Sequence, residues 1–370
     1  VVPMPAWEQR KLSEVATFGG GHTPPMADPD NYEDGYVLWV TSQDVKSNYL
    51  DRTTTQITEK GAKELTLYPA GSLVMVTRSG ILRHTLPVAE LRKPSTVNQD
   101  IRVILPQGEC CGEWLLQFFI SHNKELLLEF GKTGTTVESV DFGKIKDMLL
   151  YMPSTVEQQQ IGDFFAKLDS LITLHQRKYD KLVILKKSML EKMFPKDGES
   201  VPEIRFAGFT DPWEQRKFSE IVDVCSGRDY KHLDEGPIPV YGTGGYMTSV
   251  SEALSHNRDA IGIGRKGTID KPYLLKAPFW TVDTLFYAIP KSDINLEFAL
   301  CSFLNVDWKS KDESTGLPSL SKESINETVL SVPNVVEQNH LGNFFADLDR
   351  LITLHQRKRL SIRQRSPVWS

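Results

Sequence analysis

The chain has 370 residues, of which 40% are hydrophobic and 25% are charged. These proportions are typical of a folded protein, and they exclude a wholly disordered chain, a collagen and a disulfide scaffold. The formal net charge is −5 at pH 7, so any binding of nucleic acid must depend on local basic patches or on the charge of a partner.

The chain consists of two unequal copies of one arrangement, in which a mixed region precedes a long helix. The motif Trp-Glu-Gln-Arg-Lys begins at Trp7 and recurs at Trp213, 206 residues later. A longer segment, residues 157–178, recurs as residues 337–358, only 180 residues later. The second mixed region is therefore the shorter one. We interpret the two tryptophans as structural anchors.

The first mixed region, residues 1–152, is predicted to be a globular α/β domain. Short runs rich in β-branched and aromatic residues predict strands at 36–40, 71–77, 100–105 and 148–152. Apolar residues at helical spacing predict one helix over residues 113–130, with Gly131 as its C-cap.

Residues 153–195 predict a long helix of the coiled-coil type. Its start carries the pattern Ser154-x-x-Glu157, which is typical of a capping box. The heptad positions are Ile161, Leu168, His175, Leu182 and Met189. The proline and glycine residues between 195 and 202 end this helix and begin a linker.

The second mixed region, residues 196–332, is predicted to be a shorter α/β domain that begins with this linker. Strands are expected at 238–241, 260–264, 284–289 and 329–332. A helix is expected over 297–308, with Asn295 as its cap.

Residues 333–370 predict the second long helix, with heptad positions at Leu341, Leu348, His355 and Ile362. The heptad pattern fails after Ile362 and Pro367 breaks a helix, so we expect an altered or truncated second helix that weakens one end of the packing. The two helices are expected to form an antiparallel coiled coil with a globular domain at each end. We interpret the two seam histidines as packed, hydrogen-bonded residues and not as metal ligands.

The seam and partner-binding residues are predicted to be the same positions of both helices. They are Phe164, Phe165, Leu168, Leu171, Ile172 and His175 in the first helix and Phe344, Phe345, Leu348, Leu351, Ile352 and His355 in the second. Like helices suit two copies of one partner, whereas unlike globular domains suit two targets or two pieces of one target. A duplication without functional symmetry is the alternative.

Motifs for catalysis are weak. The sequence Gly262-x-Gly264-x-x-Gly267 fits a dinucleotide loop, but no helix start follows it. A loose nuclease pattern combines Asp30, Asp44 and Lys46. The four cysteines form no zinc pattern and no run is long enough for a membrane helix, which predicts a cytoplasmic protein with reduced thiols and no metal. The chain reads as a binder without catalysis of its own.

Basic, amide and hydroxyl side chains beside glycine follow predicted strands in both domains. Arginine and lysine pair with guanine, and asparagine and glutamine with adenine, in the major groove of DNA. The candidate DNA-binding residues are Thr41, Gln43, Arg78, Ser79, Arg83, Asn98 and Gln99 in the first domain and Tyr241, Thr243, Arg265, Lys266, Lys271 and Thr284 in the second.

This arrangement resembles the specificity (S) subunit of type I restriction-modification systems over essentially the whole chain. The resemblance is carried by the doubled Trp-Glu-Gln-Arg-Lys motif, by the helix start Pro-x-x-x-Glu-Gln at Pro153 and Pro333, and by the repeated Phe-Phe-Ala-x-Leu-Asp helices. It implies that each domain is a target recognition domain for one half of a bipartite DNA site. The helices would dock two methyltransferase (M) subunits that methylate adenine N6.

The resemblance further implies that restriction (R) subunits cleave unmodified DNA. S-adenosylmethionine, ATP and Mg²⁺ would then be bound by the partner subunits and no cofactor by this chain. Two other hypotheses remain open at this point: a self-contained nuclease or methyltransferase, and a scaffold that uses only its coiled coil.

Overall fold

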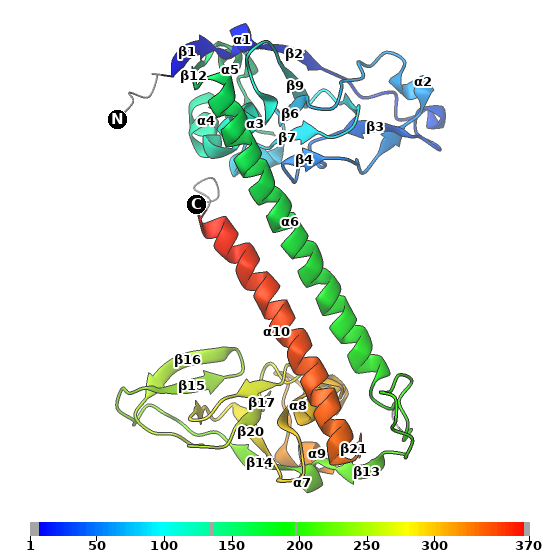
Figure 1. The fold of residues 1–370 in the computed structure, drawn as a ribbon, viewed down its shortest axis with the longest axis vertical. Helices are drawn as coiled ribbons and strands as arrows, with labels where there is room; N and C mark the ends of the chain where they lie inside the picture. Colours follow the sequence, from blue (N-terminus) through cyan, green and yellow to red (C-terminus); the bar gives the residue numbers. More distant parts are fainter. Residues whose placement is uncertain (1–6, 134–136, 197, 366–370) are drawn as a thin grey trace. The chain divides into compact units, whose positions relative to one another are not determined.

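The computed structural model describes residues 7–133, 137–196 and 198–365, without the side chains of 362–365. It divides into unit 1, which contains residues 1–174 and 358–370, and unit 2, which contains residues 175–357 (Figure 1). Each unit is a mixed α/β fold that carries one of the globular domains. Pro367 and the expected helix break there lie outside the described residues.

Unit 1 contains a five-stranded sheet with the order β2-β9-β6-β7-β4. Its strands are β2 (Ala16–Gly20), β4 (Tyr49–Leu50), β6 (Leu73–Val76), β7 (Val88–Leu91) and β9 (Ile101–Pro106). Strand β6 is buried on both faces, because Leu73 and Met75 contribute to one core while Val74 and Val76 contribute to the other. The first of these cores includes helix α3 (Gly112–Ser121).

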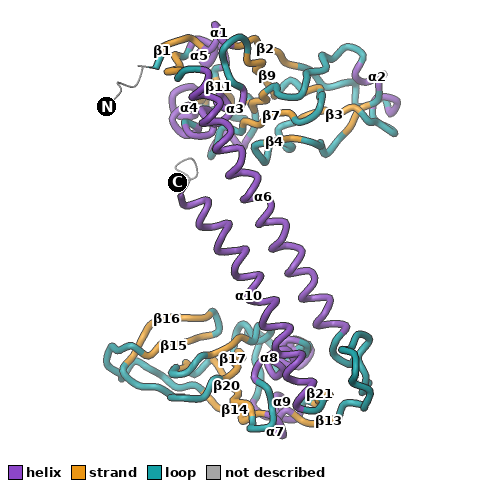
Figure 2. The backbone as a smooth tube through the Cα atoms, viewed as in Figure 1, coloured by secondary structure: helices purple, strands orange, loops and turns teal. Residues whose placement is uncertain are grey.

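A second sheet of unit 1 has the order β5-β3-β8, in which β3 (Val37–Val40) and β8 (Thr96–Val97) are parallel. Two further antiparallel pairs join β1 (Glu8–Lys11) to β12 (Leu149–Met152) and β10 (Gly131–Lys132) to β11 (Ser139–Val140). The remaining short elements are β5 (Gln56–Ile57), α1 (Leu12–Val15), η1 (Pro29–Asn31), α2 (Glu59–Ala62), η2 (Gly80–Arg83), α4 (Asn123–Phe130) and α5 (Phe142–Asp147). Helices α3, α4 and α5 gather beside the start of the long helix, while the strand-rich part lies away from it (Figure 2).

Unit 2 contains a four-stranded sheet with the order β14-β20-β17-β18 and a three-stranded sheet with the order β16-β15-β19. The strands are β14 (Val222–Ser226), β15 (Ile238–Gly242), β16 (Gly245–Val250), β17 (Ala260–Gly264), β18 (Tyr273–Leu275), β19 (Trp280–Thr281) and β20 (Leu285–Pro290). Strand β13 (Glu214–Lys217) pairs with β21 (Val329–Val332). The helices are α7 (Phe218–Ile221), α8 (Leu296–Leu304), η3 (Trp308–Lys311) and α9 (Lys322–Glu327).

The two domains share one strand topology. The order β2-β9-β6-β7 of unit 1 corresponds to β14-β20-β17-β18 of unit 2, and the parallel pair β3/β8 corresponds to β15/β19. Unit 1 has in addition β4, α2 and α4, which account for much of its greater length. The predicted strands of both domains are confirmed, with small differences at their ends.

The helix predicted over residues 113–130 is wrong in one respect, because it is interrupted at His122 between α3 and α4. The side chain of Asn123 explains the break. Its Oδ1 accepts hydrogen bonds from Leu86 N (2.9 Å) and Thr85 Oγ1 (3.0 Å), so α4 is tied to the segment that precedes β7. The helix predicted over 297–308 likewise ends early, at Leu304.

The two long helices are α6 (Thr155–Lys192) and α10 (Val335–Arg365), and both begin where the capping patterns predict. Ser154 and Asn334 accept hydrogen bonds from the N–H groups three residues later, at 3.4 and 3.0 Å. Within unit 2, His175 faces His355 and Lys186 pairs with Asp349, so the second half of α6 runs antiparallel to α10.

The repeated Pro-x-x-x-Glu-Gln start docks each long helix on its globular domain. In unit 1 the buried Gln158 donates to Pro153 O (2.9 Å) and accepts from the N–H of Cys111, the residue before α3 (2.9 Å). In unit 2 Gln338 makes the same two bonds, to Pro333 O and from the N–H of Asn295, each at 3.0 Å. Because both polar ends of the glutamine are satisfied, its burial stabilises the junction.

The predicted seam residues divide into three groups by exposure. Ile172, Phe345 and Leu348 are buried, while Phe165, Leu168, His175, Phe344, Ile352 and His355 are partly buried. In contrast, Phe164, Leu171 and Leu351 are exposed, at 58%, 44% and 41%. Within the described residues these three side chains are therefore not packed in a buried seam, and their assignment to partner binding stays a prediction.

Candidate nucleic-acid interface

In unit 1 the loop after β6 is held between two other segments. The N–H of Thr77 donates to the carbonyl of Asp100, in the turn between β8 and β9, at 2.8 Å. The N–H of Ser79 donates to Glu138 O (3.1 Å), and the N–H of Val140 donates to Thr77 O (3.0 Å). Three segments distant in sequence thus meet at the end of one buried strand.

In unit 2 the loop after β17 is held by the same pattern of backbone hydrogen bonds. We call this pattern the hydrogen-bond frame: it joins the loop to the residue before β9 or β20 and to the segment before β11 or α9. The N–H of Arg265 donates to Thr284 O (2.8 Å), that of Gly267 to Pro318 O (2.8 Å), and that of Leu320 to Arg265 O (2.9 Å). Isolated bridges join Arg78 to Ser139 in unit 1 and Lys266 to Ser319 in unit 2. The frame therefore places Lys266 at the position of Arg78, and Arg265 at that of the buried Thr77.

One glycine in each domain passes very close to the segment that receives the loop. A Cβ atom on Gly21 would lie 1.9 Å from Val97 O, and one on Gly227 would lie 2.0 Å from Val282 O. Both glycines follow the first strand of the main sheet and cross the turn that receives the loop. Only a residue without a side chain allows this approach.

The basic residues of the unit 1 loop differ in their partners. Arg78 is exposed, while Ser79 caps the short helix η2 by accepting from Ile81 N. Arg83 forms a 2.5 Å ion pair with Glu138, and this bond lowers the pKa of the Glu138 carboxyl group. Of the two arginines, Arg78 is therefore the better placed to meet a ligand.

Two predicted side chains of unit 1 are engaged inside the fold. Asn98 is buried, and its Oδ1 accepts from Asp100 N (3.1 Å), so it shapes the β8–β9 turn. Thr41 donates from its Oγ1 to Asp44 (2.8 Å). Gln43 and Gln99 are exposed, and Gln99 accepts a hydrogen bond from Thr23 Oγ1 (2.7 Å).

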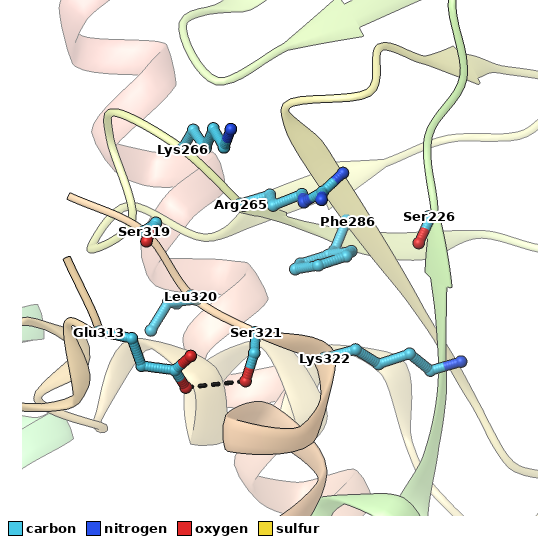
Figure 3. Close-up of a pocket in the computed structure, with 9 residues that line it drawn as sticks. All are labelled: Ser226, Arg265, Lys266, Phe286, Glu313, Ser319, Leu320, Ser321 and Lys322. Carbon is cyan, nitrogen blue, oxygen red and sulfur yellow. Dashed lines mark hydrogen bonds between the residues drawn. The ribbon is translucent and has the colours of Figure 1, made fainter. Parts of the chain in front are cut away.

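The unit 2 loop borders a cavity of about 370 Å³ (Figure 3). Its lining residues are Ser226, Arg265, Lys266, Phe286, Glu313, Ser319, Leu320, Ser321 and Lys322. The guanidinium carbon of Arg265 lies 5.9 Å from the ring centroid of Phe286, and its Nη1 donates to Asp283 O (3.4 Å). Glu313 accepts from Ser321 Oγ (2.7 Å), so the cavity combines three cations with one carboxylate that already has a partner.

The other predicted residues of unit 2 do not line this cavity. Tyr241 is partly buried, with its ring 6.3 Å from those of Tyr246 and Tyr273. Thr243 lies in the β15–β16 turn and Lys271 is exposed. Thr284 contributes its carbonyl to the frame and is itself partly exposed.

Comparison with known proteins identifies the family. The model of the type I restriction modification DNA specificity domain matches this chain twice, at residues 4–183 and 210–364. The chain belongs to this family. The two matches contain the two frames, and each reaches into one long helix, so each copy is a specificity domain with its helix.

Similar proteins carry the same description. The specificity subunit of the Escherichia coli type I restriction enzyme EcoR124I/EcoR124II is 29% identical over 186 residues, which cover 47% of this chain and 46% of that protein. The MjaIX specificity subunit of Methanocaldococcus jannaschii is 28% identical over 236 residues, 60% of this chain and 52% of that protein. The matches thus span about half the length of these relatives.

The fold is also that of a solved structure. The crystal structure of a type I restriction-modification S subunit from M. genitalium superposes with a TM-score of 0.64 at 15% identity, covering 98% of this chain and 94% of that one. At this identity the likeness concerns the fold alone.

The specificity domains do not assemble the loose nuclease pattern. Asp30 pairs with Lys60 at 2.9 Å, whereas Asp44 accepts hydrogen bonds from Thr41 and Thr54. Burial opposes ionisation of Asp44, but these hydrogen bonds outweigh it and lower its pKa. Within the described ranges, no three histidine, cysteine or acidic residues are grouped to hold a metal, and no helix is long and apolar enough to span a membrane.

Several residues of the interface are absent from the sequence-based candidates. Glu138, Ser226, Phe286 and Lys322 come from segments far from the glycine-rich loops, and the frame brings them there. Of these four, only Lys322 follows a recognisable local signal, because Ser321 before it is a serine that caps the next helix.

Proposed function

We propose that this chain is the DNA-specificity subunit of a type I restriction-modification complex. Each specificity domain reads one half of a bipartite DNA site. The observation that carries the proposal is the common frame, which presents a cation, Arg78 or Lys266, at the same place in two domains of this family. Around these cations the two domains differ, as two unlike half-sites require.

The readout residues follow from exposure. In the first domain the exposed side chains of Arg78, Gln43 and Gln99 contact base edges, Gln99 through its amide nitrogen. Ser79 and Thr41 hold the loops, and Arg83 beside Glu138 contacts phosphate. In the second domain Arg265, Lys266 and Lys271 are the cations, with Thr243, Thr284 and Tyr241 as polar neighbours. Asn98 is assigned to the turn and not to a base, because its amide is engaged.

The long helices dock two methyltransferase subunits that methylate adenine N6, and restriction subunits join the complex to cleave unmodified DNA. Apolar side chains that stay exposed on both helices suit such contacts: Phe164, Leu171 and Leu351. S-adenosylmethionine, ATP and Mg²⁺ belong to those partners, so this chain contributes recognition and no catalysis.

The test is the methylation pattern that the chain directs. The chain is co-expressed with its methyltransferase subunit in a host without adenine methylation, and N6-methyladenine is mapped by single-molecule sequencing. We expect one split motif with a modified adenine on each strand and a constant spacer. A soluble complex that methylates no DNA would contradict the proposal and favour a scaffold.

A matched pair of variants assigns the second half-site to its loop. Lys266→Ala should reduce or relax methylation in one half of the motif only. The control is Lys276→Ala, at an exposed lysine. Lys276 lies near the opposite end of β17, because its neighbour Leu275 pairs with Ala260, the first residue of that strand. Equal effects of both variants would exclude Lys266 as a reader.

A further inference from the structure

Unit 2 contains a segment that covers the start of its own long helix. This covering segment, residues 186–209, packs aromatic rings on α10 and on the tryptophan of the repeated motif. Phe194 lies 5.8 Å from Trp213 and 6.1 Å from Phe345, and Phe206 lies 5.9 Å from Phe344, all measured between ring centroids. As a result Trp213 and Phe345 are almost fully buried, at 3% and 1% exposure.

Two ion pairs anchor the covering segment. Lys186 Nζ lies 2.7 Å from Asp349 Oδ1. Arg205 binds Glu337 through two hydrogen bonds of 2.7 and 2.8 Å, and Glu337 has no exposed surface. The surface beneath the segment is thus recognised by two cations and an aromatic pair.

The repeat gives unit 1 the counterparts of this surface. We call these counterparts the Trp7 face: Trp7, Ile161, Phe165 and Leu168. Trp7, the counterpart of Trp213, is 47% exposed, so the predicted structural anchor is buried at Trp213, whereas for Trp7 it stays a prediction. The counterparts of Leu341, Phe345 and Leu348, which are buried, are only partly buried here.

The two carboxylates of this surface are also repeated in unit 1. Glu157 is the counterpart of Glu337, and Asp169 is that of Asp349. Within the described residues neither forms an ion pair; Asp169 accepts a hydrogen bond from Asn48 (2.9 Å) and burial raises the pKa of its carboxyl group. The repeat positions equivalent to 186–209 begin at residue 366, outside the described residues.

We propose that the Trp7 face is a docking site for a polypeptide segment presented by another chain and built like residues 186–209. Such a segment is a helix end that carries a lysine for Asp169 and an aromatic residue for Trp7 and Phe165, followed by a turn with an arginine for Glu157. The model for this contact is the unit 2 interface, in which residues 186–209 match α10 in shape and charge. At the equivalent positions α6 carries the same or similar side chains as α10. The proposal rests on this packing and is independent of DNA recognition.

The probe is a fluorescein-labelled synthetic peptide with the sequence of residues 183–211, titrated with the full chain and followed by fluorescence anisotropy. We expect saturable binding with a stoichiometry of one. Phe165→Asp should weaken binding at least tenfold. Leu128→Asp, at a fully surface-exposed leucine of the same unit, is the matched control and should change binding less than twofold.

A charge exchange keeps the test valid if Phe165→Asp disturbs folding. A peptide with Arg205→Glu should bind the unchanged chain at least tenfold more weakly and should regain affinity for the Glu157→Arg chain. Absence of saturable binding, or equal binding by all four combinations, would overturn the proposal. So would a fivefold gain in affinity on removal of residues 366–370, because the chain's own tail would then be the occupant.

Discussion

The Nδ1 atoms of His175 and His355 lie 2.9 Å apart, with ring centroids 5.1 Å from each other. These residues occupy the same position of the two repeated helices, so the repeat brings a residue against its own counterpart. One ring must donate and the other accept, which makes the pair asymmetric at any instant. The bond lies inside unit 2 and joins the middle of α6 to the second half of α10.

The histidine pair should contribute a coupled term to stability. His175→Leu and His355→Leu should each lower the thermal midpoint, because each leaves the other ring without this partner. The double variant should lose less than the two single losses combined, with a coupling of about 1 kcal/mol. Chemical denaturation of all four proteins gives the cycle, and strict additivity would show that the contact is not a stabilising bond.

Arg205 should be more sensitive than any exposed cation of unit 2. Arg205→Ala leaves the fully buried Glu337 without its partner, which costs about 3–5 kcal/mol in comparable buried pairs. Replacing both, as Arg205→Met with Glu337→Leu, should recover most of the loss. Lys192→Ala removes the exposed pair with Glu203 and should change the free energy of unfolding by less than about 1 kcal/mol. A double variant as unstable as the single one would contradict this account.

Two helix glycines should reject alanine. A Cβ on Gly162 would lie 2.8 Å from Glu113 Cβ, and one on Gly342 would lie 2.3 Å from Asn295 Oδ1, which caps α8. Alanine in place of glycine normally stabilises a helix by about 1 kcal/mol. Here we expect each substitution to lower the free energy of unfolding by about 1–3 kcal/mol, because the added methyl group has no room. Gly80→Ala, which meets no atom within 4 Å, is the control in a thermal shift assay. Stabilisation by Gly162→Ala would show that the helix does not dock this closely.

Unit 1 should become less stable as the pH rises toward 7. Burial, and then the neighbouring Glu113, raise the pKa of Glu90 to about 7, against an opposing effect of Arg92. Between an unfolded pKa near 4.5 and this value the folded state binds more protons, so the free energy of unfolding falls with pH over that interval.

Glu90→Gln should remove this dependence. The change in the free energy of unfolding caused by Glu90→Gln should be more favourable at pH 8 than at pH 5. The difference should be on the order of 1–3 kcal/mol. Glu59→Gln, at an exposed carboxylate of α2, should show no such trend between the two pH values. Parallel pH profiles for the original chain and the Glu90→Gln chain would mean that Glu90 ionises normally.

Much of the fold follows from local patterns. The strands around Val74 and Ile261, the caps at Ser154 and Asn334, and the two long helices all lie where periodicity and capping predict them. These features depend on hydrogen bonds and side-chain contacts within a few residues, which a single sequence displays directly. The repeat itself, and with it the family, is visible in the same way.

The interface and the exposed face depend on contacts between distant segments. Asn98 and Gln99 are neighbours of similar chemistry, yet the turn buries one and exposes the other. Trp7 and Trp213 stand in identical motifs, and only the covering segment from the end of α6 separates an exposed ring from a buried one. By itself the sequence determined the elements and their duplication, because these arise from short-range periodicity. Tertiary structure alone decided which copies are covered and which loops converge, because burial is set by the register of segments far apart in the chain.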